Sequence, residues 1–301
     1  MKQMIISNEI KINRVALIGV GMIGGSFIWS LKRAGVINHV IGVDINFDEL
    51  ETATELGIID SKSSLDGLHD IDMIVLATPV GAMASVFATL KDKDFINTAL
   101  ITDVGSTKQS VINAAQQGLG FLPKNFVPSH PIAGREHIGI QHAEEMMFYG
   151  HRAIITPHEN TDSDAVDTIK SLWEHCGASV DIMTAENHDK ILAATSHLPH
   201  VLAYGLMESL TTTEYENPIF DYAAGGFKSF TRTASSNPIM WRDICLNNKT
   251  DILYWLDHYQ QTLSELRELI AHEQGDKIEE IFQRSKSERD KYLVNKYGKT
   301  T

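Results

Sequence analysis

Apolar and polar positions alternate along the first part of the chain with two different periods. Residues 15–18 form a short apolar run that leads into a glycine turn at residues 19–24. Apolar side chains then recur with helical spacing, at Phe27, Ile28, Leu31 and Ala34. A second apolar run ends at Asp44. This order predicts a strand, a tight turn, a helix and a second strand with an acid at its end.

The same alternation continues as far as residue 184. It predicts further helices at residues 47–57, at 80–90, from about 107 onward and at about 164–176. It predicts further strands at residues 73–80, 99–105, 151–157 and 178–184, and a strand followed by a loop at 126–131. Strands separated by helices favour a mostly parallel sheet with both faces covered, so an α/β fold is expected here.

The pattern changes near Thr184, after which no strand is predicted. Long helical stretches occupy residues 185–210, 237–273 and 275–293, and a glycine- and aromatic-rich loop at 221–232 separates the first two. One predicted helix carries a wide apolar stripe, at Ile252, Leu253, Leu256, Tyr259, Leu263, Leu266 and Ile270. Such a stripe belongs either to the core of the domain or to a subunit interface.

The glycine turn has the spacing Gly19-x-Gly21-x-x-Gly24 of a dinucleotide-binding loop. Gly19 permits the tight turn, Gly21 lets the backbone approach a pyrophosphate, and Gly24 lets the helix pack close to the sheet. Free N–H groups at the start of the helix, at Met22 and Ile23, favour the phosphates. An α/β protein that keeps this turn without a ligand is the alternative, but here the strand, helix, second strand and acid all fall in register.

Asp44 lies twenty residues beyond the last glycine, where its carboxylate would accept hydrogen bonds from the ribose hydroxyls. A 2′-phosphate there would meet a like charge, so NAD is predicted rather than NADP. Thr78 and Pro79, at the end of the next apolar strand, are added to the cofactor site. We therefore predict a Rossmann-type NAD-binding domain at residues 1–184 and an all-helical substrate-binding and dimerisation domain at residues 185–301.

Composition and charge argue against several other classes of protein. The chain has 301 residues, enough for about two domains. Its net charge of −13 argues against nucleic acid and against an anionic membrane surface as partners. The sequence lacks a long apolar span and a secretory signal, which favours a cytoplasmic protein. Cys176 and Cys245 offer neither a disulfide framework nor metal-ligand spacing.

Four short motifs follow the glycine turn in a specific order. They read T-D-V-G-S-T-K at 102–108, S-H-P-I-A-G at 129–134, S-H-L-P-H at 196–200 and G-G-F-K-S-F-T-R at 225–232. With these motifs the chain resembles the prephenate dehydrogenase family, including its arogenate and cyclohexadienyl relatives. The resemblance runs from about Arg14 to beyond Trp241, nearly the whole chain. Little chain lies outside it, so no appended mutase or regulatory domain is expected.

The resemblance implies that the chain converts prephenate and NAD⁺ into 4-hydroxyphenylpyruvate, CO₂ and NADH, on the route to tyrosine. In this reaction, hydride leaves C4 of the ring for the nicotinamide as the C4 hydroxyl loses its proton. The dienone that develops draws electrons from the carboxylate at C1, and aromatisation drives the loss of CO₂. The site therefore needs a proton acceptor at the hydroxyl, a cation for the carboxylate and bound NAD⁺.

The resemblance assigns two of these roles, and a supporting one, to residues of this chain. His130 meets the C4 hydroxyl, and a neutral imidazole suits that task near pH 7. Ser106 is implied to hydrogen-bond His130, and its alternative role is the N-cap of the helix that begins near residue 107. Arg232 matches the substrate arginine of the family. Its rigid guanidinium fork suits a carboxylate.

Two further histidines, His197 and His200, lie three positions apart and share one helical face. The resemblance places His200 against the substrate, and we count His197 with it. Two such histidines could also hold a metal, but no third ligand stands at a supporting spacing, so no metal site is predicted. We expect Pro199 to kink this helix.

Two departures from the family's pattern lie beside these motifs. Arg135 stands where relatives often carry a small or hydroxylic residue, and Glu136 follows it. Ser229 stands where some relatives carry an acid. An added cation and a missing acid make the site more positive, which favours the pyruvyl carboxylate of prephenate over the ammonium group of arogenate. Glu136 could turn inward and supply the missing acid, so Arg135 and Glu136 are both counted as substrate-binding candidates.

Other functions remain open at this point. An arogenate or cyclohexadienyl dehydrogenase would use the same residues. A β-hydroxyacid dehydrogenase would use a lysine on the first long helix of the second domain, where Lys190 is available. An NAD-sensing binding protein would need none of Ser106, His130 and Arg232. Helical second domains of dehydrogenases often dimerise, so a homodimer formed through the helical domain is expected.

Overall fold

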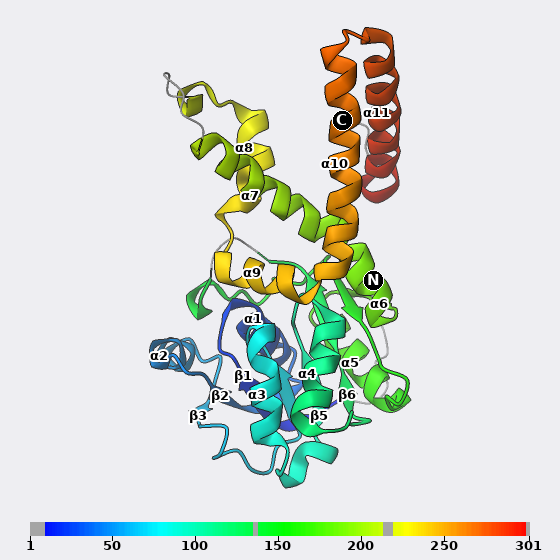
Figure 1. Cartoon of the computed structure of the whole chain (residues 1–301). Coiled ribbons are helices and arrows are strands. Elements are labelled where there is room, and N and C mark those ends of the chain that lie inside the picture. Colours follow the sequence, from blue (N-terminus) through cyan, green and yellow to red (C-terminus); the bar gives the residue numbers. More distant parts are fainter. Residues whose placement is uncertain (1–9, 135–137, 213–218, 299–301) are drawn as a thin grey trace. The chain divides into compact units, whose positions relative to one another are not determined.

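The computed structural model describes residues 10–134, 138–212 and 219–298 (Figure 1). Arg135 and Glu136 therefore lie outside the described residues. The chain divides into two compact units, Met1–Asp251 and Ile252–Thr301. None of the helices within the described ranges is long and apolar enough to cross a membrane.

A six-stranded parallel sheet is the centre of the first unit. Its strands are β1 (Ile12–Ile18), β2 (Ile37–Val43), β3 (Ser61–Lys62), β4 (Met73–Leu76), β5 (Leu100–Asp103) and β6 (Phe126–Val127), in the order β3-β2-β1-β4-β5-β6. Ile18 pairs with both Val43 and Leu76, and Leu76 pairs with Asp103. The carboxyl ends of four neighbouring strands therefore meet at one edge, where ligands bind in sheets of this kind.

Helices cover both faces of this sheet, as the sequence predicts (Figure 1). They are α1 (Met22–Arg33), α2 (Phe47–Glu55), α3 (Val80–Leu90), α4 (Lys108–Leu119) and α5 (Ser163–His175), with a 3₁₀ turn at Asp94–Asn97. Successive residues of β1 enter different cores, because side chains alternate across a strand. Leu17 packs in the core that contains Phe27 of α1 and Trp173 of α5, whereas Ile18 packs in the core that contains Phe87 of α3.

A second, three-stranded sheet follows the first. Its strands are β7 (Ser129–Ile132), β8 (Arg152–Ile155) and β9 (Ser179–Ile182), with β8 in the middle, antiparallel to β7 and parallel to β9. The predicted loop after Phe126 is therefore wrong, because Ser129 begins a strand. Prolines at 128 and 131 argue against a strand in the sequence, but β7 is an edge strand, where a missing N–H is tolerated.

The rest of the first unit is helical, and no described residue after Ile182 lies in a strand. Its elements are α6 (Ala185–Leu192), a π-helical turn (Ala193–His197), α7 (Leu198–Thr211), 3₁₀ turns at Ile219–Tyr222 and Arg232–Ser235, α8 (Gly225–Thr231) and α9 (Pro238–Asn247). Where the sequence predicts a kink, a π-helical turn ends just before α7, and Pro199 stands in the first turn of that helix. The predicted loop at 221–232 is wrong, because α8 forms there despite two glycines at its start.

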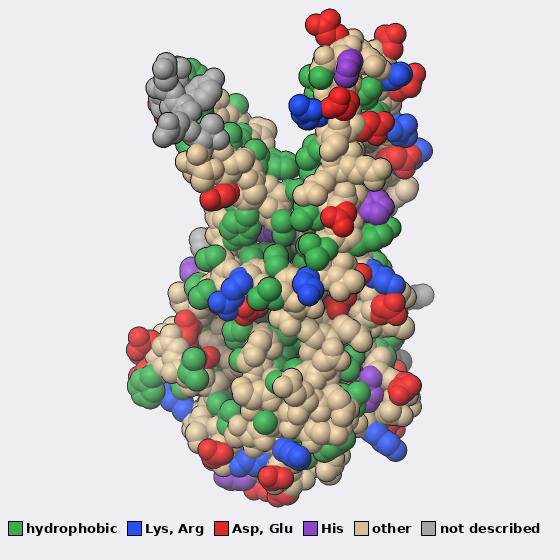
Figure 2. Space-filling model, in the orientation of Figure 1, with side chains coloured by type: hydrophobic (Ala, Val, Ile, Leu, Met, Phe, Trp, Pro, Cys, Tyr) green, Lys and Arg blue, Asp and Glu red, His purple; other side chains and the backbone are tan. Residues whose placement is uncertain are grey.

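The second unit consists of two long helices that lie side by side, α10 (Lys249–Ala271, which begins in the first unit) and α11 (Gly275–Tyr297) (Figure 1). Charged side chains gather near the turn that joins them, with apolar side chains exposed among them (Figure 2). In the apolar stripe of α10, Ile252 is buried, but Leu263 is 46% exposed and Ile270 is 63% exposed. The stripe is therefore only partly covered within the chain.

Candidate active site

The glycine turn joins β1 to α1 in the conformation that the sequence predicts. Gly19 has a φ angle of +91°, and a Cβ atom there would lie 2.5 Å from the carbonyl carbon of Ala77. A Cβ atom on Gly24 would lie 2.6 Å from the Cβ atom of Ala77, so only glycine lets α1 approach β4 this closely. Around Gly21, in contrast, nothing lies within 4 Å of the Cβ position.

The groups around Gly21 fit the phosphates of a dinucleotide. Gly21 is the N-cap of α1 and no side chain caps the helix, so the first N–H groups, at Met22 and Ile23, face the open turn. The hydroxyl of Thr78 is buried and has no hydrogen-bond partner within the described residues. Pro79 follows as the exposed N-cap of α3. An open backbone cradle with an unsatisfied hydroxyl beside it is a site shaped for a polar ligand.

Asp44 directly follows β2 at the same edge of the sheet. Its Oδ2 atom accepts a hydrogen bond of 2.7 Å from the amide of Val20 in the glycine turn, and its Oδ1 atom accepts one of 2.8 Å from the amide of Asn46. A carboxylate has about four lone-pair sites, so both oxygens can still accept from a ribose diol. Asp44 therefore orients the turn and presents an acceptor beside it.

A buried ion pair lies at the end of β5, a strand that β1 and β4 separate from β2. The Lys108 ammonium group donates a hydrogen bond to the Asp103 carboxylate, and both side chains are fully buried. The same ammonium group donates to the carbonyl of Ser129 at 2.7 Å, and the amide of Ser129 donates to Asp103 at 3.1 Å. Burial raises the pKa of Asp103 and lowers that of Lys108, while the attraction between the two groups opposes both shifts.

His130 follows Ser129 in β7 and is half-buried. Its Nδ1 atom lies 2.9 Å from the Nε2 atom of His188, and the Nδ1 atom of His188 lies 2.8 Å from the Asp189 carboxylate. Burial lowers the pKa of His130 well below its ordinary value, and the neighbouring His188, Lys108 and His197 act in the same direction. His130 is therefore a neutral imidazole near pH 7.

His197 and His200 lie against the same tryptophan of α9. The ring of His200 stacks on Trp241 with 3.6 Å between centroids, and the ring of His197 meets Trp241 edge-on at 6.0 Å. Asn248 donates a hydrogen bond of 3.1 Å to His197. Burial lowers the pKa of His197 to about 4, so this histidine too is neutral near pH 7. The described residues include no group of three His, Cys, Asp or Glu side chains that could hold a metal ion.

The other predicted site residues lie as follows. Ser106 stands in the loop between β5 and α4, but the N-cap of α4 is Thr107, so the alternative role of Ser106 as N-cap is wrong. Among the described side chains, the partner of the His130 ring is His188 and not Ser106. Ser229 lies on α8 and Arg232 directly follows that helix, and both side chains are exposed.

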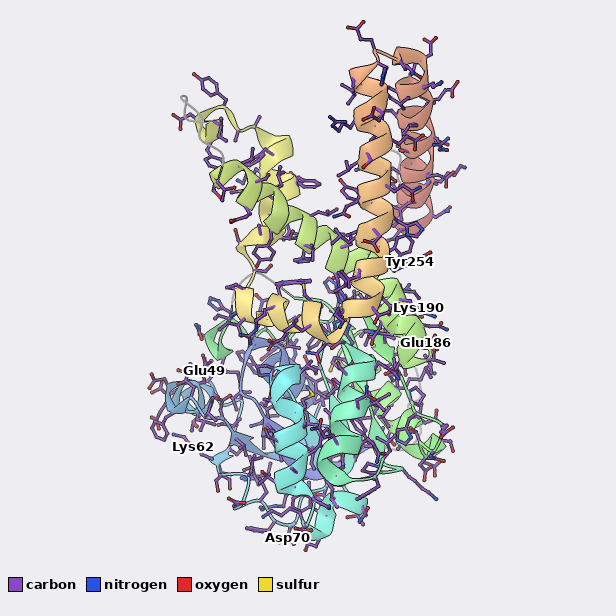
Figure 3. The ribbon with its side chains drawn as sticks, viewed as in Figure 1. Glu49, Lys62, Asp70, Glu186, Lys190 and Tyr254 are labelled. Carbon is purple, nitrogen blue, oxygen red and sulfur yellow. The ribbon has the colours of Figure 1, made fainter. Side chains whose placement is uncertain are left out.

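Lys190 does not join the histidine cluster. It lies on α6 and donates a hydrogen bond of 2.6 Å to Glu186 one turn away (Figure 3). The hydrogen bond and the attraction raise the pKa of Lys190, and its side chain is 55% exposed. An exposed, paired ammonium group is a poor proton acceptor, which disfavours the lysine-dependent alternative.

Sequence reasoning missed four residues that the structure adds to the cluster, namely His188, Asp189, Trp241 and Asn248. His188 and Asp189 lie one turn before the π-helical segment, in a stretch whose other charged residues are exposed. Two adjacent titratable side chains at buried positions of one helix were the signal that could have revealed His188 and Asp189. Trp241 and Asn248 come from α9 and its end, so only the packing of α9 reveals their place.

Comparisons with known proteins decide the family. The model of the prephenate dehydrogenase nucleotide-binding domain matches residues 28–182, and that of the prephenate dehydrogenase dimerization domain matches residues 184–284. The chain belongs to the prephenate dehydrogenase family. The family and the fold class that the sequence predicts are therefore confirmed, and this family member is an oxidoreductase.

Individual members of the prephenate dehydrogenase family are similar along nearly the whole chain. A prephenate dehydrogenase of Bacillus subtilis is 35% identical over 296 residues, which is 97% of this chain and 79% of the relative. A cyclohexadienyl dehydrogenase of Zymomonas mobilis is 37% identical over 283 residues, 91% of this chain and 94% of the relative. The crystal structure of a prephenate dehydrogenase from A. aeolicus, solved with hydroxyphenyl propionate and NAD⁺, is 35% identical with a TM-score of 0.87 and covers 95% of this chain and 100% of its own.

The buried ion pair gives a prediction about stability. Asp103→Ala leaves the Lys108 ammonium group buried without its countercharge, so we expect the free energy of unfolding to fall by about 3–5 kcal/mol. Urea denaturation measures this change. The double variant Asp103→Ala/Lys108→Met removes both charges and should recover part of the loss. If Asp103→Ala unfolds at the same midpoint concentration of urea as the wild type, the pair does not have the stabilising role given to it here.

Proposed function

We propose that the chain catalyses the NAD⁺-dependent oxidative decarboxylation of prephenate to 4-hydroxyphenylpyruvate, CO₂ and NADH. One observation carries the proposal. His130, a neutral and half-buried histidine, follows β6 at the edge of the sheet where β1 and β2 present the glycine turn and Asp44. The glycine turn at the edge of the first sheet and His130 in β7 of the second sheet belong to one compact unit, which holds the cofactor and the proton acceptor for one reacting carbon.

The residues divide the chemistry between them. Bound NAD⁺ supplies the hydride acceptor, and the glycine turn, Asp44 and Thr78 hold it. His130 takes the proton of the C4 hydroxyl, so that the electron pair of the O–H bond forms the C=O bond as hydride leaves C4. The bond between C1 and its carboxylate then breaks and CO₂ departs. The electron pair of this bond makes the ring aromatic and moves onto the C4 oxygen, which takes the proton back from His130. Prephenate carries two carboxylates, and negative charge near His130 raises its proton affinity once the substrate is bound.

Substrate binding falls to residues of the helical part. Arg232 binds a carboxylate through its planar fork, and His200 contacts the substrate beside Trp241. His197, which also contacts Trp241, lies beside His200 on the substrate-binding side. Ser106, from the loop after β5, hydrogen-bonds the hydroxyl or His130 when substrate is present. Ser229, in place of an acid, favours prephenate over arogenate, and Arg135 adds to this preference while Glu136 opposes it.

The assembly is proposed to be a homodimer formed through the helical domain at residues 185–301, with the NAD-binding domain at residues 1–184. Leu263 and Ile270 of α10 support a subunit interface, because large exposed apolar side chains on one helix are typical of association surfaces. The matched model of a dimerization domain covers the same helix. A cytoplasmic location remains a prediction from the sequence.

Offering the purified chain three substrates separately tests the proposed function. We expect NADH to form with prephenate, with kcat/KM at least about tenfold higher than with arogenate, which corresponds to about 1.4 kcal/mol of discrimination. A 3-hydroxy acid should give no NADH. Faster oxidation of arogenate would reverse the substrate assignment, and oxidation of the 3-hydroxy acid alone would overturn the proposed reaction.

Replacement of His130 tests the proton acceptor. His130→Asn should lower kcat with prephenate by about 10²–10⁴-fold, the range for loss of general acid–base help, and should leave NAD⁺ binding nearly unchanged. His69→Asn is the matched control, because the His69 side chain is 71% exposed. Near-wild-type turnover of His130→Asn would remove His130 from the mechanism.

A further inference from the structure

A chain of four hydrogen bonds leads from His130 to the start of α4. The Nδ1 atom of His130 lies 2.9 Å from the Nε2 atom of His188, whose Nδ1 atom lies 2.8 Å from the Oδ1 atom of Asp189. The same Oδ1 atom lies 2.8 Å from the backbone nitrogen of Lys108, and the Oδ2 atom lies 2.9 Å from that of Gln109. His188 and Asp189 are both buried.

The backbone end of this chain fixes the direction of every hydrogen bond in it. A backbone N–H group only donates, so both oxygens of Asp189 accept, as those of an ionised carboxylate do. The Nδ1 atom of His188 must then carry a proton and donate it to Asp189. A neutral imidazole has one N–H group, so the Nε2 atom of His188 accepts from the Nδ1–H group of His130. The lone pair of His130 is thereby confined to Nε2.

The surroundings of Asp189 and His188 favour an ionised Asp189 and a neutral His188. Burial alone would raise the pKa of Asp189, but hydrogen bonds from His188 and the two α4 amides outweigh it and hold the pKa below its ordinary value. Burial lowers the pKa of His188, although Asp189 opposes the shift. Near pH 7 the pair is therefore a carboxylate and a neutral imidazole.

Asp189 also serves the fold, which explains why the carboxylate is held so firmly. The hydroxyl of Thr107, the N-cap of α4, bonds the Ser110 hydroxyl and none of the free backbone N–H groups of the helix, and Asp189 from α6 accepts from those groups instead. Asn248 donates to the carbonyl of Asp189 at 2.8 Å and to His197. The orientation of Asp189 is thus set by the framework and does not depend on the substrate.

We propose that His188 is a positioning residue for the reaction proposed above, which holds His130 in the Nδ1–H tautomer so that its Nε2 atom faces the substrate as the base. Asp189 fixes the tautomer of His188 in turn. The proton of the substrate hydroxyl moves to Nε2 of His130, and the positive charge that results is stabilised through His188 by the Asp189 carboxylate. This inference rests on the proposed function for its substrate, but the tautomer itself does not.

Two substitutions of His188 separate positioning from packing. His188→Leu keeps the site apolar and removes the acceptor, so we expect kcat with prephenate to fall about 10²-fold while KM for NAD⁺ stays unchanged. His188→Gln can present its amide oxygen where the Nε2 atom lies, so kcat should return to within about tenfold of wild type. Equal loss in both variants would overturn the proposal, because a packing role does not require an acceptor.

A double-variant comparison tests whether the two histidines act as a unit. In a His130→Asn background, His188→Leu should cause no further loss of kcat, because residues that act together are strongly non-additive. A further loss of the same size as in wild type would show that His188 acts independently of His130 and would overturn the proposal.

The tautomer can be observed without any substrate. In protein labelled with ¹⁵N-histidine, the nitrogen resonances missing from His130→Asn identify His130. We expect a protonated Nδ1 and an unprotonated Nε2 in wild type at pH 7.5, and the loss of this single state in His188→Leu. A protonated Nε2 in wild type would overturn the inference even if prephenate is oxidised. If the expected tautomer is observed but prephenate is not oxidised, the inference about the tautomer holds and only the proposed function is overturned.

Discussion

The buried ion pair of Asp103 and Lys108 holds together the three elements that surround the candidate active site. Asp103 ends β5, Lys108 begins α4, and both groups bind the backbone of Ser129 in β7, one residue before His130. Taking two charges out of water is costly, and such pairs are seldom the most stable choice for a core. Here the cost is offset by hydrogen bonds that fix where β7 begins. The position of His130 therefore depends on this pair.

The same elements connect the cofactor edge to the histidine cluster. Parallel register brings the ends of β1, β2, β4 and β5 together, so the glycine turn and Asp44 share an edge with Asp103. The start of α4 receives Asp189 from α6, which orients His188 and through it His130. The candidate cofactor edge, His130 and the groups that orient this histidine thus come from neighbouring elements of one compact unit.

Much of the fold could be predicted from the sequence because it follows from local patterns. The period of the apolar residues revealed β1, α1 and the change to helices after Thr184, and the spacing of three glycines revealed a turn in which only glycine fits at Gly19 and Gly24. The first sheet is parallel as predicted, but β7 was missed because its proline, Pro131, is tolerated only at an edge, and edges are set by long-range pairing. Helix α8 was missed because helix propensity argues against its two glycines, while its contact with α7 is visible only in the fold.

The candidate site was less predictable for a similar reason. The residues that motifs mark, such as His130 and His200, were named at once, whereas His188 and Asp189 are distinguished only by burial and by partners 58 and 81 positions away in the chain. Trp241 likewise gains its place only when α9 brings it against His200. Contacts between distant segments carry this information, and one sequence without its fold does not.

The central claim is that His130 is a half-buried, neutral base in the free enzyme. The pH dependence of kcat/KM with prephenate tests this claim most directly, because kcat/KM reports the ionisation of the free enzyme. A base works only when deprotonated, and burial together with His188, Lys108 and His197 holds the pKa of His130 well below its ordinary value of 6.5. The account predicts a kcat/KM that stays constant as pH falls from 7.5 through 6.5 and declines only well below that value. An acidic limb with an apparent pKa at or above 6.5 would contradict it.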